Sequence, residues 1–468
     1  MHDVTAPSNS GGALRPLVAL ALSSLVPLLI YDGEWTLTAL LVGVNAAYAG
    51  FRFGWTCFAP SPRLLAGFFW LFMYIFGGLA PLAQVASHRW PLGTGVPDGP
   101  VRVAAVIVLV FVISYDVGTG FARRAGPTRP PRRALKSERI MMIAVFAVIT
   151  AVYEVYRIGG IGNLFTSRAR LGSLIRQDLA SAAAPIHAAL LGVPTFIAGY
   201  LMIAGRKTGQ LGQRTLQIMI MVPLALVLTN PFTSSRYVLG TVVLGLALIA
   251  LQPLSSTLYR CMLLGLGAGL VFAFKVFDRF RYEKPVTSST VTFDVQSQFQ
   301  NGDYDAFQQI AHGAEWVAST GYHPEQLLGP PFFWVPRIVW PDKPYDTGIA
   351  LALFKGFHFT NLSAPIPAEL YVAGGVFAVI LGGVLMGWLW TRLDRHLELH
   401  GPAGWVGLVV PVLAVYQFIL LRGSLLQATG RLVVILGLLW FATTPMRRES
   451  PGSLTTELAT QASGRREN

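Results

Sequence analysis

Runs of apolar residues alternate with short polar connections along nearly the whole chain, from Leu14 to Phe441. The runs are too long and too uniformly apolar for membrane strands, and a helix satisfies its own backbone polar groups in lipid. The pattern therefore predicts twelve membrane helices. They are expected at 14–30, 35–50, 64–86, 103–121, 140–157, 183–204, 215–230, 237–252, 261–277, 366–390, 404–421 and 431–445.

Lysine and arginine gather in one set of connections between these segments. The connection 123–139 is the most basic, and the arginines near 206–214, 392–395 and 447–448 fall on the same side. Short cytoplasmic loops retain positive charge, so this side is predicted to face the cytoplasm. Twelve crossings then place both termini in the cytoplasm, and the first segment is expected to be a retained anchor.

One long connection, 278–365, lies on the opposite side and holds nine of the 23 acidic residues. Within it, the spacing of Phe307, Ile310, Ala311, Ala314 and Val317 predicts a helix over 304–319, with carboxylates at its start where they suit the helix dipole. We expect this helix to lie over the bundle as a lid. The chain thus divides into nine membrane helices (1–277), the outer loop with its lid helix (278–365), three more membrane helices (366–445) and a cytoplasmic tail (446–468).

Composition agrees with a membrane protein and narrows its chemistry. The 468 residues are 53% hydrophobic and 13% charged, with a mean hydropathy of +0.53, which excludes soluble enzymes and secreted disulfide scaffolds. The net charge of +13 is explained by the cytoplasmic loops, so no nucleic-acid partner is expected. Cys57 and Cys261 are far apart in apolar segments, so they are expected to be core residues. Neither a metal site nor a cofactor is predicted.

Several arginines occupy positions where the same charge rule disfavours them. Seven lie at or near the predicted outer interface: Arg157, Arg168, Arg170, Arg176, Arg236, Arg422 and Arg431. Guanidinium groups bind phosphate oxygens through two parallel hydrogen bonds, so an external anion such as a lipid-linked pyrophosphate would explain them. Each alone is also explained by snorkelling to lipid headgroups. Arg236 is the sharpest candidate, because a very short turn holds it at the start of the eighth helix, where its neighbours in space should be helix ends.

At these positions the chain resembles bacterial oligosaccharide repeat-unit polymerases of the O-antigen polymerase (Wzy) type. The resemblance is spread over about two thirds of the chain. It rests on motifs in a fixed order: Ile158-Gly159-Gly160-Ile161 with Arg168 and Arg170, Ser234-Ser235-Arg236, Gly329, Pro336-Arg337, Trp340-Pro341-Asp342-Lys343-Pro344, Pro367-Ala368-Glu369-Leu370-Tyr371 and Gly374-Gly375.

The resemblance implies an all-α integral membrane protein of about twelve transmembrane helices with one large extracytoplasmic loop, resembling GT-C-type membrane glycosyltransferases. It also implies glycosyl transfer at the outer face of the bacterial cytoplasmic (inner) membrane. Undecaprenyl-pyrophosphate-linked oligosaccharides would be donor and acceptor. Beyond the lipid bilayer, a flippase and a chain-length regulator of the same pathway are the expected partners.

This chemistry needs cations for the departing pyrophosphate and a base for the acceptor hydroxyl. Candidates for the first role are Arg168, Arg236, Arg337, Lys343, Arg422 and Arg431. Candidates for the base are Glu369, His312, His323, Asp303, Asp305 and Glu315. The histidines also fit ordinary loop residues, and the two aspartates fit a helix start. Glu369 is harder to explain otherwise, because a carboxylate two residues into an apolar helix needs a partner.

Three alternatives remain open. One is a polyprenyl-dependent transferase of the other large class, with Asp32 or Glu34 as base, although a hairpin of about four residues offers little structure for a sugar site. Another is an O-antigen ligase. The non-enzyme alternative is a flippase or transporter, which the lack of similarity between the two halves and the polar mass in one loop disfavour.

Overall fold

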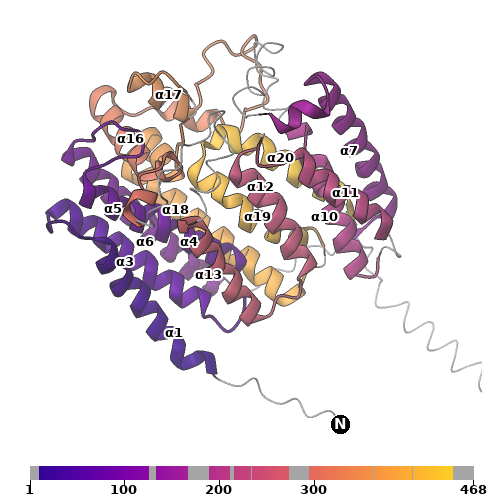
Figure 1. Cartoon of the computed structure of the whole chain (residues 1–468), viewed down its shortest axis with the longest axis horizontal. Coiled ribbons are helices and arrows are strands. Elements are labelled where there is room, and N and C mark those ends of the chain that lie inside the picture. The colour runs from indigo at the N-terminus through magenta and orange to yellow at the C-terminus, as the bar shows by residue number, and fades with distance from the viewer. Residues whose placement is uncertain are drawn as a thin grey trace, which may run out of the picture.

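The computed structural model describes residues 10–125, 133–166, 189–210, 215–272 except 233, and 295–445 except 361 and 403. Helices dominate this part of the chain (Figure 1). The α-helices are α1 Ser10–Leu20, α2 Val26–Ile30, α3 Leu37–Cys57, α4 Leu64–Tyr74, α5 Ala80–Ser87, α6 Asp98–Arg124, α7 Ser137–Arg157, α10 Val193–Lys207, α11 Thr215–Leu228, α12 Arg236–Ala250, α13 Ser256–Phe272, α15 Val295–Gln298, α16 Ala306–Thr320, α17 Thr347–Phe354, α18 Ile366–His400, α19 Gly404–Arg422 and α20 Leu425–Phe441. The π-helical segments are η1 Ala21–Leu25 and η2 Ile75–Leu79, and the 3-10 turns are η3 Ile161–Phe165, η4 Gly302–Tyr304 and η5 Pro324–Leu328.

Each of the twelve apolar segments predicted from the sequence overlaps a helix of the structure. Five helical segments among the described residues are long and apolar enough to cross a membrane: Leu64–Ser87, Asp98–Arg124, Ser137–Arg157, Ile366–His400 and Gly404–Arg422. Shorter apolar helices are Leu14–Ile30, Thr215–Leu228, Arg236–Ala250, Ser256–Phe272 and Leu425–Phe441. By the length and composition of its helices, the chain is a mostly helical membrane protein.

The centre of the bundle is the continuous helical run α4–η2–α5. Nearly every residue of this run is buried, and it packs against α3 and α19. Its aromatic side chains fix their neighbours: the rings of Phe69 and Tyr115 stack with centroids 3.7 Å apart, and Trp70 meets Tyr115 edge to face at 5.5 Å. Such pairs add to the stabilisation from burial alone.

Helices α6 and α18 share the most extensive contact of any pair in the described structure. Glycines allow it: a Cβ on Gly118 of α6 would overlap the carbonyl of Val384, and a Cβ on Gly387 of α18 would overlap the carbonyl of Tyr115. Small residues let membrane helices approach until their backbones touch. We call this contact the α6–α18 seam.

The helix predicted in the long outer loop forms as α16, within two residues of the expected bounds. Its position differs from the predicted lid. Ten of its fifteen residues are buried and it packs against both α6 and α18, so it belongs to the bundle. The reason is its composition, since Gln308, Gln309 and His312 are fully buried beside the expected apolar residues. In Figure 1, α16 and α17 lie together at one end of the molecule.

Two smaller features also differ from expectation. A short antiparallel ribbon pairs β1 Arg133–Leu135 with β2 Thr443–Pro445, and Arg133 reinforces it by donating to the hydroxyl and carbonyl oxygens of Thr443, both at 2.8 Å. Cys57 is buried as expected, but Cys261 is exposed.

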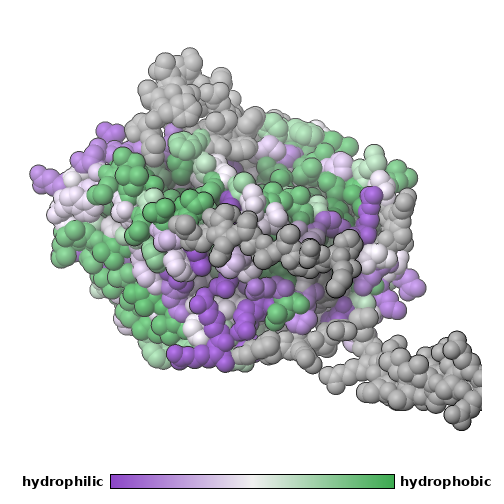
Figure 2. Space-filling view, turned by 90° about the horizontal axis from the view of Figure 1, so that it is seen from below, coloured by the Kyte–Doolittle hydropathy of each residue, from purple (hydrophilic) through white to green (hydrophobic). Residues whose placement is uncertain are grey.

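Apolar side chains are extensively exposed on the outer helices, and Figure 2 shows apolar surface flanking hydrophilic residues gathered in the lower middle of the view.

Candidate functional site

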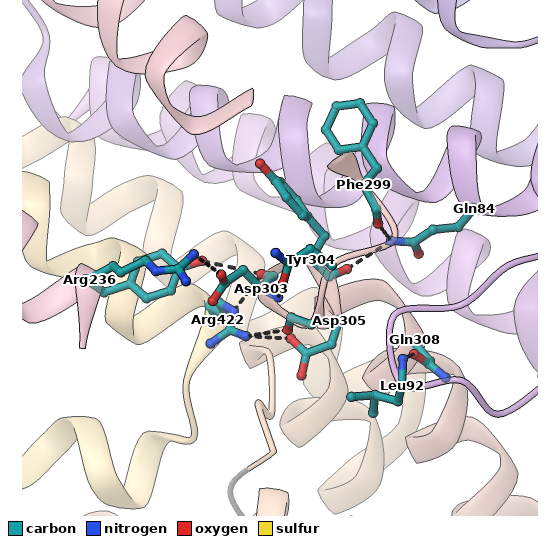
Figure 3. Close-up of polar contacts among 12 residues, drawn as sticks. Gln84, Leu92, Arg236, Phe299, Asp303, Tyr304, Asp305, Gln308 and Arg422 are labelled. Atoms are coloured by element: carbon teal, nitrogen blue, oxygen red, sulfur yellow. Dashed lines mark hydrogen bonds and ion pairs between the residues drawn. The ribbon is translucent and has the colours of Figure 1, made fainter. Parts of the chain in front are cut away.

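Three distant segments bring two arginines and two aspartates together. Arg236, the first residue of α12, forms an ion pair with Asp303, and Arg422, the last residue of α19, donates from Nη2 to Asp305 Oδ1 at 2.8 Å (Figure 3). The two aspartates are 7% and 3% exposed. Buried carboxylates need partners of this kind, because an unpaired buried charge is costly. We call Arg236, Asp303, Asp305 and Arg422 the Arg–Asp cluster.

Arg422 is held by more than one contact. Its Nε donates to the carbonyl of Asp303 at 3.0 Å, and Nη2 also donates to the carbonyl of Gly302 at 3.1 Å. Its guanidinium carbon lies 5.1 Å from the ring centroid of Tyr237, and the Tyr237 hydroxyl donates to the carbonyl of Asp303 at 3.4 Å. Arg422 therefore fixes the backbone that carries both aspartates.

Local sequence explains why Arg236 stands at a helix start. Ser235 is the N-cap of α12, and its hydroxyl accepts a hydrogen bond from the Val238 amide at 3.3 Å. Serine is a favoured residue at this position because it satisfies an otherwise unpaired helix amide. The prediction that Arg236 begins a helix and lies near helix ends is confirmed. Its partner Asp303 lies three residues before α16 and also accepts a hydrogen bond from Arg422 at the end of α19.

The aspartate segment is inserted into the bundle. Tyr304, between the two aspartates, is 1% exposed, and its ring stacks on Phe76 with centroids 5.4 Å apart. Gln84 on α5 donates through Nε2 to the carbonyls of Phe299 at 2.8 Å and Tyr304 at 3.0 Å (Figure 3). Irregular backbone inside a membrane bundle needs such donors from its neighbours.

A second group of acids meets the connection between α19 and α20. Glu369 is 4% exposed, and its Oε1 accepts a hydrogen bond from the Leu425 amide at 3.1 Å. Asp346 accepts a hydrogen bond from the Ser424 hydroxyl, and its Oδ1 accepts the Gly348 amide at 2.9 Å. Burial raises the pKa of Asp346 above its usual range. We call Asp346 and Glu369 the acid pair.

The α19–α20 connection joins the two groups. Arg422 ends α19, and Ser424 and Leu425, two and three residues later, contact the acid pair. A connection this short leaves little freedom between the cations and the carboxylates. Arg422 of the Arg–Asp cluster therefore lies two residues from Ser424, which contacts the acid pair.

The helix that carries Glu369 is interrupted just after it. Gly374 and Gly375 have non-helical backbone angles, and Gly375 adopts a φ of +62°. A side chain at Gly375 would meet the ring of Tyr322. The interruption leaves the carbonyl of Val372 to accept the backbone amide of His323 at 2.8 Å. Discontinuous helices of this kind mark binding sites in many transport proteins.

The two candidate histidines differ in their surroundings. His323 hydrogen-bonds through its ring nitrogens to Thr320 Oγ1 at 2.8 Å and Glu325 Oε1 at 3.0 Å, and its ring stacks on Trp316. His312 is fully buried near Phe357, and neither ring nitrogen has a hydrogen-bond partner in the described part of the chain. Burial, and then the charge of Lys355, lower the pKa of His312 to about 3. No described contact joins either histidine to the Arg–Asp cluster.

Arg337 and Lys343 hold their own loop together. Arg337 donates to the carbonyls of Lys343 at 2.6 Å and Pro344 at 3.2 Å, and Lys343 donates to those of Phe333 at 2.8 Å and Val335 at 2.9 Å. Burial and the neighbouring Arg337 charge lower the pKa of Lys343. Their described contacts stabilise the chain that leads to Asp346 and do not reach the Arg–Asp cluster.

The remaining candidates are placed as follows. Glu315 forms an ion pair with Lys355, with Nζ 3.0 and 2.9 Å from its two oxygens. Arg431, half-buried on α20, makes no side-chain hydrogen bond or ion pair with a described residue. Arg168 lies outside the described residues.

Four residues of the site were missed by sequence reasoning: Gln84, Tyr237, Asp346 and Ser424. Asp346 carried a local signal, because Asp346-Thr347-Gly348 fits the N-cap of a helix and does cap α17. Ser424 lies two residues after Arg422, in the short connection between α19 and α20. Gln84 is a lone amide in an apolar run and needed a partner. Comparison of the chain with protein-family models, with curated proteins and with solved structures found no match.

Proposed function

We propose that this protein is a membrane glycosyltransferase that polymerises undecaprenyl-pyrophosphate-linked oligosaccharide repeat units into a surface polysaccharide such as O-antigen, capsule or exopolysaccharide. The observation that carries the proposal is the meeting of Arg236, Arg422, Asp303 and Asp305, chosen from sequence as pyrophosphate ligands or bases, at the ends of three helices. The motif order of the outer loop and of the tenth predicted span supports the same family.

The proposed reaction joins two lipid-linked chains. A hydroxyl oxygen of the acceptor sugar attacks the anomeric carbon of the donor, and the bond from that carbon to the pyrophosphate oxygen breaks. The hydroxyl proton passes to Glu369, and undecaprenyl pyrophosphate leaves with the electron pair of the broken bond. Arg236 and Arg422 stabilise the leaving charge with their guanidinium groups.

The aspartates have a positioning role in this proposal. Ion pairing with Asp303 and Asp305 holds the two guanidinium groups in place before substrate arrives. Preorganised cations stabilise developing charge without the cost of reorienting side chains during the reaction. Asp346 lies next to Glu369 through Thr347 and Ser424, and supports that carboxylate as a proton acceptor.

The reaction is proposed at the outer face of the bacterial cytoplasmic membrane, with twelve spans, both termini in the cytoplasm and residues 278–365 outside. A flippase would deliver the repeat units and a chain-length regulator would end growth. The alternative base in the first outer connection has less support, because Asp32 and Glu34 are exposed. The O-antigen ligase remains the enzyme from which an assay must distinguish this one.

Purified protein in proteoliposomes with a lipid-linked repeat unit of the native strain tests the proposal. Products longer than one unit on polyprenyl pyrophosphate are the expected result, with undecaprenyl pyrophosphate released in equal amount to the linkages formed. Transfer only when lipid A core is supplied would show a ligase. If the gene is deleted and lipid-linked units accumulate only on the cytoplasmic leaflet, the protein is a flippase and the proposal fails.

A further inference from the structure

A cavity of about 240 Å³ lies beside the start of α4, at the opposite end of the helical run α4–η2–α5 from Gln84. Four arginines line it: Arg52 on α3, Arg63 just before α4, Arg123 on α6 and Arg395 on α18. Four like charges around one small space repel one another, and the repulsion is relieved by an anion among them. The cavity belongs to no part of the candidate site described above.

The acidic residues nearby neutralise only part of the charge of these arginines. Asp394 lines the cavity, but its two carboxylate oxygens accept the backbone amides of Leu65 at 2.9 Å and Ala66 at 3.0 Å, at the start of α4. Asp116 pairs with Arg52. Glu398, the other acid of the lining, is exposed.

Several donors at the cavity are unused. Arg63 and Arg123 make no side-chain hydrogen bond or ion pair with a described residue. The Arg52 Nε and the Tyr115 hydroxyl are buried and likewise have no partner in the described chain. Tyr115 is fully buried, and its ring is held in place by its stacking on Phe69. Buried donors without partners destabilise a fold unless a ligand or water satisfies them.

The cavity is separate from the Arg–Asp cluster. Ala66 lines the cavity, whereas Phe76 stacks on Tyr304 between the two aspartates of the cluster. Trp70 also lines the cavity and precedes Phe76 by six residues of helix, which is about 9 Å along the axis. Variants of one site therefore leave the contacts of the other intact.

We propose that this arginine-lined cavity is a second binding site, which takes a single phosphate group. Guanidinium groups and a hydroxyl are the donors that phosphate oxygens favour. The volume sets the size of the ligand, because drug-sized and nucleotide ligands occupy roughly 300–1,000 Å³. A phosphate group with a few attached atoms fits, either as a lipid headgroup or as a free phosphate. On the topology proposed above, the site faces the cytoplasm.

Matched variants test the site in the full-length protein, purified in an uncharged detergent at constant ionic strength. Thermal unfolding is followed while sodium phosphate replaces sodium chloride, and separately while phosphatidylglycerol replaces phosphatidylcholine. The pocket variant is Arg123→Gln, which removes one positive charge from the lining. The control is Arg124→Gln, which removes the same charge from the next residue of α6, outside the cavity lining.

The expected result is stabilisation of the wild type and of Arg124→Gln by one of the two probes, with apparent affinity at least tenfold weaker in the pocket variant. Glu398→Gln removes a negative charge from the lining and should tighten binding severalfold, a gain that misfolding cannot produce. Stabilisation by sodium phosphate identifies a free phosphate, and stabilisation by phosphatidylglycerol alone identifies a headgroup. Equal loss in the pocket variant and Arg124→Gln, or no binding of either probe, would overturn the proposal.

Discussion

Arg236 forms its ion pair with Asp303 although 67 positions of sequence separate the two residues. The contact ties the first turn of α12 to the segment that precedes α16. Asp303 in turn offers its backbone carbonyl to Arg422. One buried aspartate therefore organises both arginines of the candidate site, and it does so before any substrate is bound.

The first prediction concerns the guanidinium fork of Arg236. Arg236→Lys keeps a positive charge for Asp303 but cannot form two parallel hydrogen bonds to phosphate, so transfer should fall about a hundredfold at normal membrane levels. Polymer formation in proteoliposomes measures the rate. The control is Arg157→Lys, which changes an arginine paired with Glu154 at 2.9 Å on α7. Normal polymer from Arg236→Ala would remove Arg236 from the site.

The second prediction distinguishes the contribution of Arg422 to stability from its contribution to sugar transfer. Arg422→Gln leaves Asp305 buried without its cation, which should lower the free energy of unfolding by about 3–5 kcal/mol. Pairing Arg422→Met with Asp305→Leu removes both charges and should restore much of that stability without restoring transfer. The free energy of unfolding of each variant is measured in detergent. Arg124→Gln, which alters an exposed arginine in the last turn of α6, is the control and should change stability little.

The third prediction assigns the proton acceptor. Glu369→Gln keeps an oxygen to accept the Leu425 amide, so the protein should fold, but it removes the base and should slow transfer by roughly a hundredfold or more. Glu315→Gln, which alters a carboxylate paired with Lys355 outside the cluster, should retain activity. If the two variants transfer sugar equally well, the base lies elsewhere, and Asp346→Asn becomes the next variant to measure.

The fourth prediction follows from the low pKa of His312, about 3 in the folded protein against 6.5 for an unperturbed histidine. The unfolded chain binds this proton more readily than the folded one, so the contribution to stability is complete above pH 6.5 and is lost as the pH falls toward 3. Each pH unit within that window costs about 1.4 kcal/mol. His312→Leu should remove this slope. His323→Gln should keep it, and an unchanged slope in His312→Leu would contradict the buried neutral histidine.

The sequence predicted local features of the fold better than distant contacts. Apolar runs located the helices, and the spacing from Phe307 to Val317 located α16. Both signals depend only on the order of apolar and polar residues within one segment. The pairing of Asp303 with Arg236 could not be predicted, since charge alone does not specify which of many opposite charges it meets. The insertion of Tyr304 also escaped prediction. It depends on Gln84 and Phe76, two residues more than 200 positions away.

The α6–α18 seam limits how a large substrate can enter. The backbones meet so closely at Gly118 and Gly387 that not even a methyl group fits between them, so α6 and α18 leave no opening for a lipid chain along this seam. Glu369 lies on the part of α18 that precedes the break at Gly374 and Gly375, whereas Gly387 lies beyond that break. On the proposed function, a polyprenyl chain therefore has to reach the site by a route other than between α6 and α18. The seam closes one side of the bundle, and the break in α18 separates this closed side from the turn that carries Glu369.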